Sequence, residues 1–264
     1  MPKIAIVAFI IFILAILMTM TGRGGGNFYV LTFVLAGLPM HEAATTGQFV
    51  LFTTAIAATV IFRRGKTISI SLALVLGVLT AGMAFIGGFV ANSFSGKELK
   101  IVFSILLAIA GSAMLFTAEE IKKDTKKKWG FWNLRNGNEI YVINLWLAVP
   151  LTMVTGFFSG MVGVSGGSFL VPLMVLACGV PMRIAVGTAS AMVAATALAG
   201  FAGHALHGSF NPVWALPIAC VTIFGGVLGG KIALKTKPKY LKTLFAVTTL
   251  IAAILMFVNS VGAE

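Results

Sequence analysis

The feature that most constrains the fold is an internal repeat, in which one passage of the sequence occurs twice, about 142 residues apart. Residues 37–40 (GLPM) recur as residues 179–182 (GVPM), and the glycine-rich residues 22–28 correspond to residues 163–169, one residue out of step. In a chain as apolar as this one, a two-fold repeat with glycine breaks at matching points is typical of a secondary transporter. The repeat therefore predicts two structurally related halves.

Composition indicates that the chain lies in a membrane. Apolar residues make up 59% of the 264 residues, charged residues only 10%, and the mean hydropathy is +1.03. Ordinary soluble domains contain roughly 45–50% apolar and about 25% charged residues. The net charge of +12 could suit a nucleic acid, but the basic residues lie in short clusters between apolar runs. We therefore expect the lipid bilayer as a partner and no nucleic acid.

Cysteines and histidines are few and do not form clusters. Cys178 and Cys220 lie in apolar runs without the spacing of metal ligands, so we expect small buried side chains, with a sulfur-handling thiol as the alternative. His204 and His207 lie three apart at the end of an apolar segment, where we expect solvent-facing polar ends. The sequence predicts no metal site and no cofactor.

Each half divides into five apolar segments, which predict an all-α integral membrane protein. The first repeat covers residues 1–118 and the second covers residues 143–264, with a basic cytoplasmic linker at 119–142. About eight segments are long enough to be full spans, and two are short half-helices. The expected segments are 4–20, 28–38, 44–62, 68–91, 101–116, 143–160, 169–179, 186–205, 213–230 and 241–258.

The two short segments, 28–38 and 169–179, are too short to cross a bilayer. About 11 helical residues reach only about 16 Å, whereas the hydrocarbon core is ~30 Å thick. Non-helical backbone at membrane depth occurs only where it is buried in protein or faces a water-filled cavity. The glycine loops that precede both half-helices are therefore expected at a cavity.

Basic residues predict the orientation of the chain, because positive loops face the cytoplasm. The basic cluster at residues 63–66 follows the third segment of the first half, whereas the cluster at residues 231–242 follows the fourth segment of the second half. This difference predicts an inverted second repeat. The alternative has four spans per half, re-entrant half-helices and parallel halves, with the loop at 231–242 outside. Three clusters contain 14 of the 19 basic residues: Arg63, Arg64 and Lys66; Lys122, Lys123, Lys126, Lys127, Lys128 and Arg135; and Lys231, Lys235, Lys237, Lys239 and Lys242.

An inverted repeat places its substrate site near the midplane, where the broken helices of the two halves meet. Half-helix N-termini offer unpaired N–H donors and partial positive charge, which favour an anion. Arg23 interrupts the first glycine loop, and its planar fork suits an oxyanion. The candidate substrate-binding residues are Arg23, Gly24, Gly25, Gly26, Asn27, Thr46, Gln48, Ser165, Gly166, Gly167, Ser168, Thr188 and Ser190.

Local structural roles are the alternatives for these residues. Arg23 could extend to the membrane interface and bind lipid phosphate. Asn27 and Ser168 could cap the half-helices, and Thr46 and Thr188 could bond backward within their own helices.

Glu42 and the preceding His41 lie near the start of an apolar segment and are candidates for coupling transport to protons. The alternative is structural. Pro39 at the first turn of a helix would put the Glu42 carboxylate close to the positive helix end, where it is stabilised.

The second half carries the motifs of a known family. Residues 156–172 read GFFSGMVGVSGGSFLVP, residues 185–190 read AVGTAS, and residues 239–245 read KYLKTLF. These stretches resemble the TauE/SafE sulfite exporter family, also called the toluene sulfonate uptake permease family, and the resemblance covers essentially the whole chain. In the first half, Leu31 replaces the usual half-helix proline of the family and Arg23 enters the glycine loop.

The resemblance implies a carrier of the bacterial inner membrane for sulfur-containing anions: sulfite, thiosulfate or organosulfonates such as sulfoacetate. Combined with the expected anion site, it predicts a secondary transporter that works by alternating access and is not an enzyme. A passive anion channel and a membrane enzyme acting on sulfur or thiols through Cys178 are the alternatives. The coupling ion (proton or sodium), the direction of transport and the choice between monomer and homodimer stay open.

Overall fold

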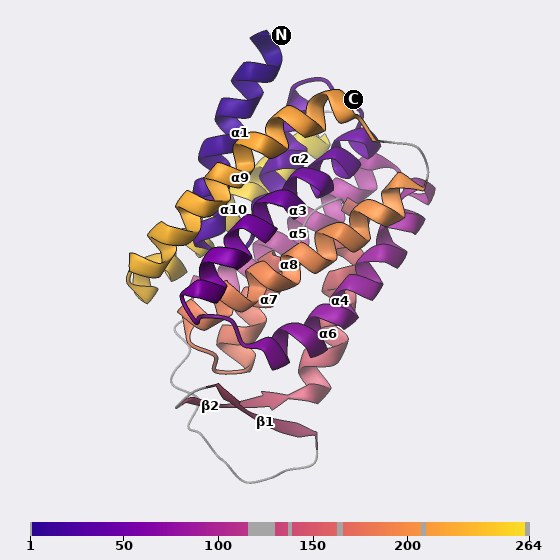
Figure 1. The fold of residues 1–264 in the computed structure, drawn as a ribbon. Helices are drawn as coiled ribbons and strands as arrows, with labels where there is room; N and C mark the ends of the chain where they lie inside the picture. Colours follow the sequence, from indigo (N-terminus) through magenta and orange to yellow (C-terminus); the bar gives the residue numbers. More distant parts are fainter. Residues whose placement is uncertain (1, 116–129, 137–138, 163–165, 207–209, 262–264) are drawn as a thin grey trace.

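The computed structural model describes residues 2–115, 130–136, 139–162, 166–206 and 210–261 of the chain. Within these residues lie ten α-helices, a 3-10 turn (Ala91–Ser93), a π-helical turn (Leu173–Ala177) and a two-stranded sheet (Figure 1). The helices are α1 (Pro2–Met20), α2 (Gly26–Leu35), α3 (Met40–Arg64), α4 (Ile70–Val90), α5 (Gly96–Leu115), α6 (Leu145–Val162), α7 (Gly167–Pro172), α8 (Met182–Ala205), α9 (Pro212–Lys235) and α10 (Pro238–Val261).

The predicted all-α membrane architecture is confirmed. Within the described residues, seven helices are long and apolar enough to cross a bilayer: α1, α3, α4, α6, α8, α9 and α10. Helix α5, expected as an eighth span, runs from Gly96 to Leu115 and carries Lys97 and Glu98 in its first turn. Both predicted half-helices are short: α2 has 10 residues, and α7 has 6 before the π-helical turn.

The second half-helix changes its hydrogen bonding at a proline. Pro172 lacks an amide donor and disturbs the preceding turn. Beyond it the chain continues with bonds over five residues, such as Cys178 N–H to the Leu173 carbonyl at 3.2 Å. At the matching point of α2 stands Leu31, and α2 stays α-helical to Leu35.

Equivalent helices of the two halves make equivalent contacts, each with a helix of the other half. Helix α1 packs on α9 as α6 packs on α4, and α3 packs on α9 as α8 packs on α4. Two further pairs join equivalent helices of the two halves, α3 with α8 and α5 with α10. Helices α3 and α8 have the most deeply buried apolar windows of the seven long helices, so this pair forms the centre of the bundle.

Glycines allow these helices to approach closely, as small residues do in membrane proteins. A Cβ on Gly229 would lie 2.5 Å from the Ile16 carbonyl oxygen of α1, and one on Gly226 would lie 2.6 Å from the Thr54 carbonyl oxygen of α3. The glycine-rich stretch of α9 is therefore a packing surface.

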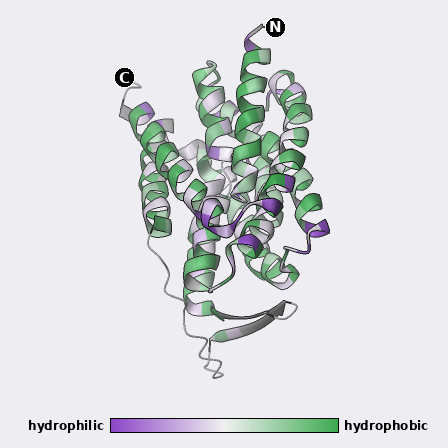
Figure 2. Ribbon diagram, turned by 90° about the vertical axis from the view of Figure 1, so that its left-hand side faces the viewer, coloured by the Kyte–Doolittle hydropathy of each residue, from purple (hydrophilic) through white to green (hydrophobic). Residues whose placement is uncertain are grey.

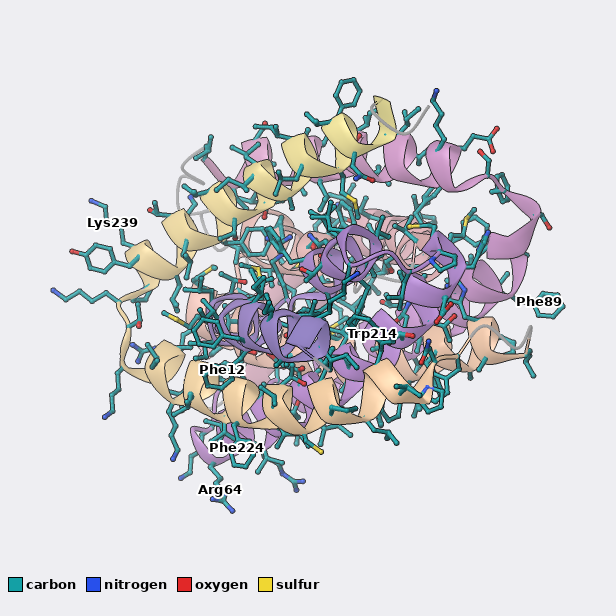
Figure 3. The ribbon with its side chains drawn as sticks, turned by 90° about the horizontal axis from the view of Figure 1, so that it is seen from above. Phe12, Arg64, Phe89, Trp214, Phe224 and Lys239 are labelled. Atoms are coloured by element: carbon teal, nitrogen blue, oxygen red, sulfur yellow. The ribbon has the colours of Figure 1, made fainter. Side chains whose placement is uncertain are left out.

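The outward helix faces are apolar and the hydrophilic residues gather at loops and helix ends (Figure 2). Phe89 and Phe224 are 51% and 68% exposed and point away from the bundle (Figure 3). Such a surface suits contact with lipid tails.

Part of the central linker forms a β-hairpin that the sequence analysis did not anticipate. Strand β1 (Phe131–Asn136) pairs antiparallel with β2 (Glu139–Asn144). Ile143 of β2 and Trp132 of β1 pack into the apolar cluster that contains Phe62 near the end of α3 and Leu241 near the start of α10. The hairpin therefore covers one end of the bundle.

Two basic clusters lie at this same end. Gly65, just after α3, lies against Leu234 of α9, and Arg183 Nη2 at the start of α8 donates to the Thr236 carbonyl at 3.1 Å. Arg64 and Lys239 extend outward from the bundle (Figure 3). Helix α1 begins and α10 ends at the opposite end (Figures 1 and 2).

Candidate functional site

The loop at residues 21–25, here the arginine loop, is wedged between α3 and α8. Gly22 and Gly24 have φ angles of 75° and 68°, which favour glycine. A Cβ on Gly22 would lie 2.6 Å from the Val186 carbonyl oxygen of α8, and one on Gly24 would lie 2.5 Å from the Leu51 side chain of α3. Both backbone conformation and close packing therefore require glycine at these positions.

The starts of the two half-helices meet beside this loop. The Ser168 hydroxyl, in the first turn of α7, donates to Asn27 Oδ1, in the first turn of α2, at 3.5 Å. A Cβ on Gly167 would lie 3.1 Å from both the Arg23 Cα and the Gly22 carbonyl oxygen. The structure thus brings together the equivalent positions of the two halves, as the repeat predicts.

Asn27 and Ser168 do not act as helix caps. The N-cap residues are Gly25 for α2 and Gly166 for α7, and neither helix has a side-chain cap hydrogen bond. The capping alternative for these two side chains is wrong. Both are buried, with 1% and 0% of their surface exposed, and they bond across the junction between the halves.

Arg23 connects the arginine loop to the second half of the chain. Its Nε donates to the Ser168 hydroxyl at 3.0 Å, and its Nη1 donates to the hydroxyls of Thr249 at 2.8 Å and Thr248 at 3.2 Å. The guanidinium carbon lies 5.1 Å from the centre of the Phe245 ring, within the range of a cation–π contact. The side chain is fully buried, so it does not extend to the membrane interface.

The α10 contribution was not predicted from the sequence. In the repeat, residues 248–249 (Thr-Thr) correspond to residues 106–107 (Leu-Leu), just as Arg23 corresponds to Val164. The hydroxyls thus occur only in the second half, opposite the arginine of the first half. Comparing the two repeats does not reveal them, because their counterparts are leucines. Two consecutive threonines in an apolar helix were the available signal.

Two candidate residues of α3 are buried without a hydrogen-bond partner among the described residues. These are the Thr46 hydroxyl and both amide atoms of Gln48. The Gln48 amide lies directly against Gly200 of α8, at the central helix pair. Buried polar groups are normally satisfied, so these atoms are available to a ligand or to water. Asn27 Nδ2 also has no hydrogen-bond partner among the described residues.

Other candidate residues have local structural roles. The Thr188 hydroxyl accepts from the Ser69 N–H at 2.9 Å and so fixes the start of α4; it does not bond backward within α8. The Ser190 hydroxyl donates to the Val186 carbonyl at 3.1 Å, one turn earlier in α8. Ser165 lies outside the described residues.

Glu42 joins the starts of two helices. Its carboxylate accepts a hydrogen bond from Asn211 Nδ2, and the Asn211 Oδ1 caps α9 by accepting from the N–H of Val213 at 3.2 Å. Glu42 stands in the first turn of α3, as the structural alternative expects, and His41 beside it is half-buried. The described residues contain no group of three or more histidine, cysteine or acidic side chains that could hold a metal ion.

With this geometry in view, comparison with known proteins identifies the family. The family described as Sulfite exporter TauE/SafE matches residues 7–256. The chain belongs to the TauE/SafE family. It is therefore a multi-pass membrane protein of a transporter family, with seven long apolar helices among the described residues.

Relatives of the chain are named as membrane transporters. It is 23% identical over 232 residues to YunE of Bacillus subtilis, a probable membrane transporter protein, covering 84% of this chain and 85% of the relative. It is 26% identical over 264 residues to a probable membrane transporter protein of Methanocaldococcus jannaschii, covering 93% and 91%. It is also 21% identical over 265 residues to YfcA of Escherichia coli K12, a probable membrane transporter protein, covering 100% of this chain and 93% of the relative. No solved structure matches the chain.

Proposed function

We propose that this TauE/SafE protein is a secondary transporter that moves a small sulfur-containing oxyanion across the bacterial inner membrane by alternating access. The substrate is sulfite, which the family description names, or thiosulfate or an organosulfonate such as sulfoacetate, as the sequence resemblance implies. The observation that carries the proposal is the buried Arg23 at the junction of the two half-helices, bonded to Ser168 and to α10.

The chemistry of the junction favours an anion. The Ser168, Thr248 and Thr249 hydroxyls are neutral, so they position the guanidinium without balancing its charge. An oxyanion carries the opposite charge and accepts hydrogen bonds from a planar guanidinium fork. The Asn27 Nδ2 donor, which has no partner among the described residues, would add orientation. We place Thr46 and Gln48 in the same ligand shell.

The buried state of the junction supports alternating access. Arg23, Asn27 and Ser168 are at most 1% exposed, which suits an occluded conformation. To open, the protein would separate the arginine loop of the first half from α7 and α10 of the second. Equivalent helices of the two halves make equivalent contacts with the other half, which supports an inverted repeat. In such a repeat, one half moves against the other.

Flux through reconstituted protein tests this function. Proteoliposomes loaded with unlabelled sulfite should take up radiolabelled sulfite faster than empty ones, because a carrier exchanges substrate across the membrane. Uptake that is equal in both, or that does not saturate, would instead indicate an anion channel. Imposing a pH gradient or a sodium gradient in parallel experiments identifies the coupling ion. If Glu42 couples substrate transport to protons, Glu42→Gln should alter only the uptake driven by the pH gradient.

A further inference from the structure

A second site lies on the outer surface of the bundle, away from the arginine loop. A groove of about 1180 Å³ is lined by residues of α3, α4 and α8. These three helices lie side by side on the face turned toward the viewer in Figure 1. Its lining on α8 is Ala191, Ala195 and Ala199, spaced one turn apart. The α4 wall carries Leu74 and Val78, which are 61% and 67% exposed. The groove is therefore apolar and faces the position of the lipid.

One end of this groove is basic. Arg63, in the last turn of α3, and Lys66, just after it, both line the groove and are both exposed. None of the described residues that line the groove is acidic. Because both basic residues lie where α3 ends and shortly before α4 begins, they stand at the level expected for lipid headgroups.

We propose that the groove binds one anionic phospholipid of the cytoplasmic leaflet. Arg63 and Lys66 bind its phosphate, and one acyl chain lies along the alanine floor. The α4 wall runs from Ile70 to Ile86, about 24 Å at 1.5 Å per residue. That length exceeds one leaflet of a hydrocarbon core of ~30 Å, so a whole acyl chain fits.

Charge complementarity favours a lipid over a helix from a second copy of the chain. A packed helix would cover Arg63 and Lys66 and would need a carboxylate to pair with them. Of the seven acidic residues, Glu139 lies in strand β2, and the two in described helices are Glu42 and Glu98. Both are in first turns and already accept hydrogen bonds, from Asn211 and from the Ser95 N–H. An anionic headgroup would supply the opposite charge directly.

Native mass spectrometry of the purified chain tests the proposal. Titration with dioleoyl phosphatidylglycerol and with dioleoyl phosphatidylcholine gives the Kd of the first bound lipid. Each basic residue should contribute about fivefold, so the anionic lipid should bind about 25-fold more tightly. The double variant Arg63→Gln/Lys66→Gln should lose this preference, whereas Arg64→Gln/Lys239→Gln removes the same charge outside the groove and should keep it.

The apolar part of the groove needs its own variant. Ala195→Phe fills the floor at an exposed position without changing charge, and it should weaken phosphatidylglycerol binding at least fivefold. Inorganic phosphate at the same concentration should not displace the lipid. Equal binding of the two lipids, an equal loss in the control pair, or full competition by phosphate would overturn the proposal. So would a dimer that Ala195→Phe dissociates, because a second copy would then occupy the groove.

Discussion

Replacing Thr249 with valine tests whether α10 holds the buried arginine. The Thr249 hydroxyl accepts a hydrogen bond from Arg23 Nη1 at 2.8 Å and donates one to the Phe245 carbonyl at 2.6 Å. Valine keeps the β-branched shape of threonine within the helix. The substitution therefore removes the acceptor while leaving the shape of α10 in place.

The expected loss follows from the charge on the donor. A hydrogen bond to a charged group contributes about 1.5–3 kcal/mol. Since 1 kcal/mol shifts the melting temperature of a chain of roughly this size by about 2–4 °C, Thr249→Val should melt about 3–12 °C below wild type. Thr248 accepts from the same Nη1 at the longer distance of 3.2 Å, so Thr248→Val should lose less. The double variant should lose more than the sum of both, because each hydroxyl partly replaces the other.

Thermal unfolding in detergent micelles, followed by tryptophan fluorescence, measures this loss. Thr243→Val is the matched control, because Thr243 lies on the same helix, is exposed, and donates to the Lys239 carbonyl. Its stability should change by less than about 0.5 kcal/mol. Identical melting of wild type, Thr249→Val and Thr243→Val would refute the idea that α10 anchors Arg23.

Two further substitutions test the packing and the helix ends by the same unfolding assay. Gly160→Ala places a Cβ against the Ala84 carbonyl oxygen and should destabilise the protein by about 1–3 kcal/mol, whereas Gly82→Ala meets nothing within 4 Å and should be neutral or slightly stabilising. Equal effects of the two would contradict the close packing of α6 on α4. Asn211→Ala removes the cap of α9 and the bond to Glu42, so it should cost about 1 kcal/mol or more. An unchanged melting temperature would show that neither bond contributes.

The sequence predicts those parts of the structure that recur in both halves. The short half-helices follow from glycine breaks at matching positions and from segments too short to span a bilayer. The meeting of Asn27 and Ser168 follows from their equivalence, because an inverted repeat brings equivalent broken helices together.

Features that break the repeat could not be predicted in the same way. The threonines at 248–249 correspond to leucines, so their contact with Arg23 appears only when α10 packs beside the arginine loop. The hydrogen bond from the Ser69 N–H to Thr188 could not be predicted either, because Ser69 lies 119 residues earlier in the chain. The β-hairpin was missed because apolar spans were the only elements sought, although Asn136 is followed by glycine between two strand-like runs.

The measurement that tests the central claim most directly is a thermal-shift screen of wild type, Arg23→Gln and Arg183→Gln. The ligands are sulfite, sulfate, thiosulfate, sulfoacetate and matched carboxylates. Arg183 is the control, since it bonds to the Thr236 carbonyl at the basic end of the bundle. At 100 times its Kd, a ligand stabilises the folded state by about 2.7 kcal/mol. We predict that a sulfur oxyanion stabilises wild type and Arg183→Gln but not folded Arg23→Gln. An undiminished shift in Arg23→Gln would contradict the assignment of Arg23 to the anion site.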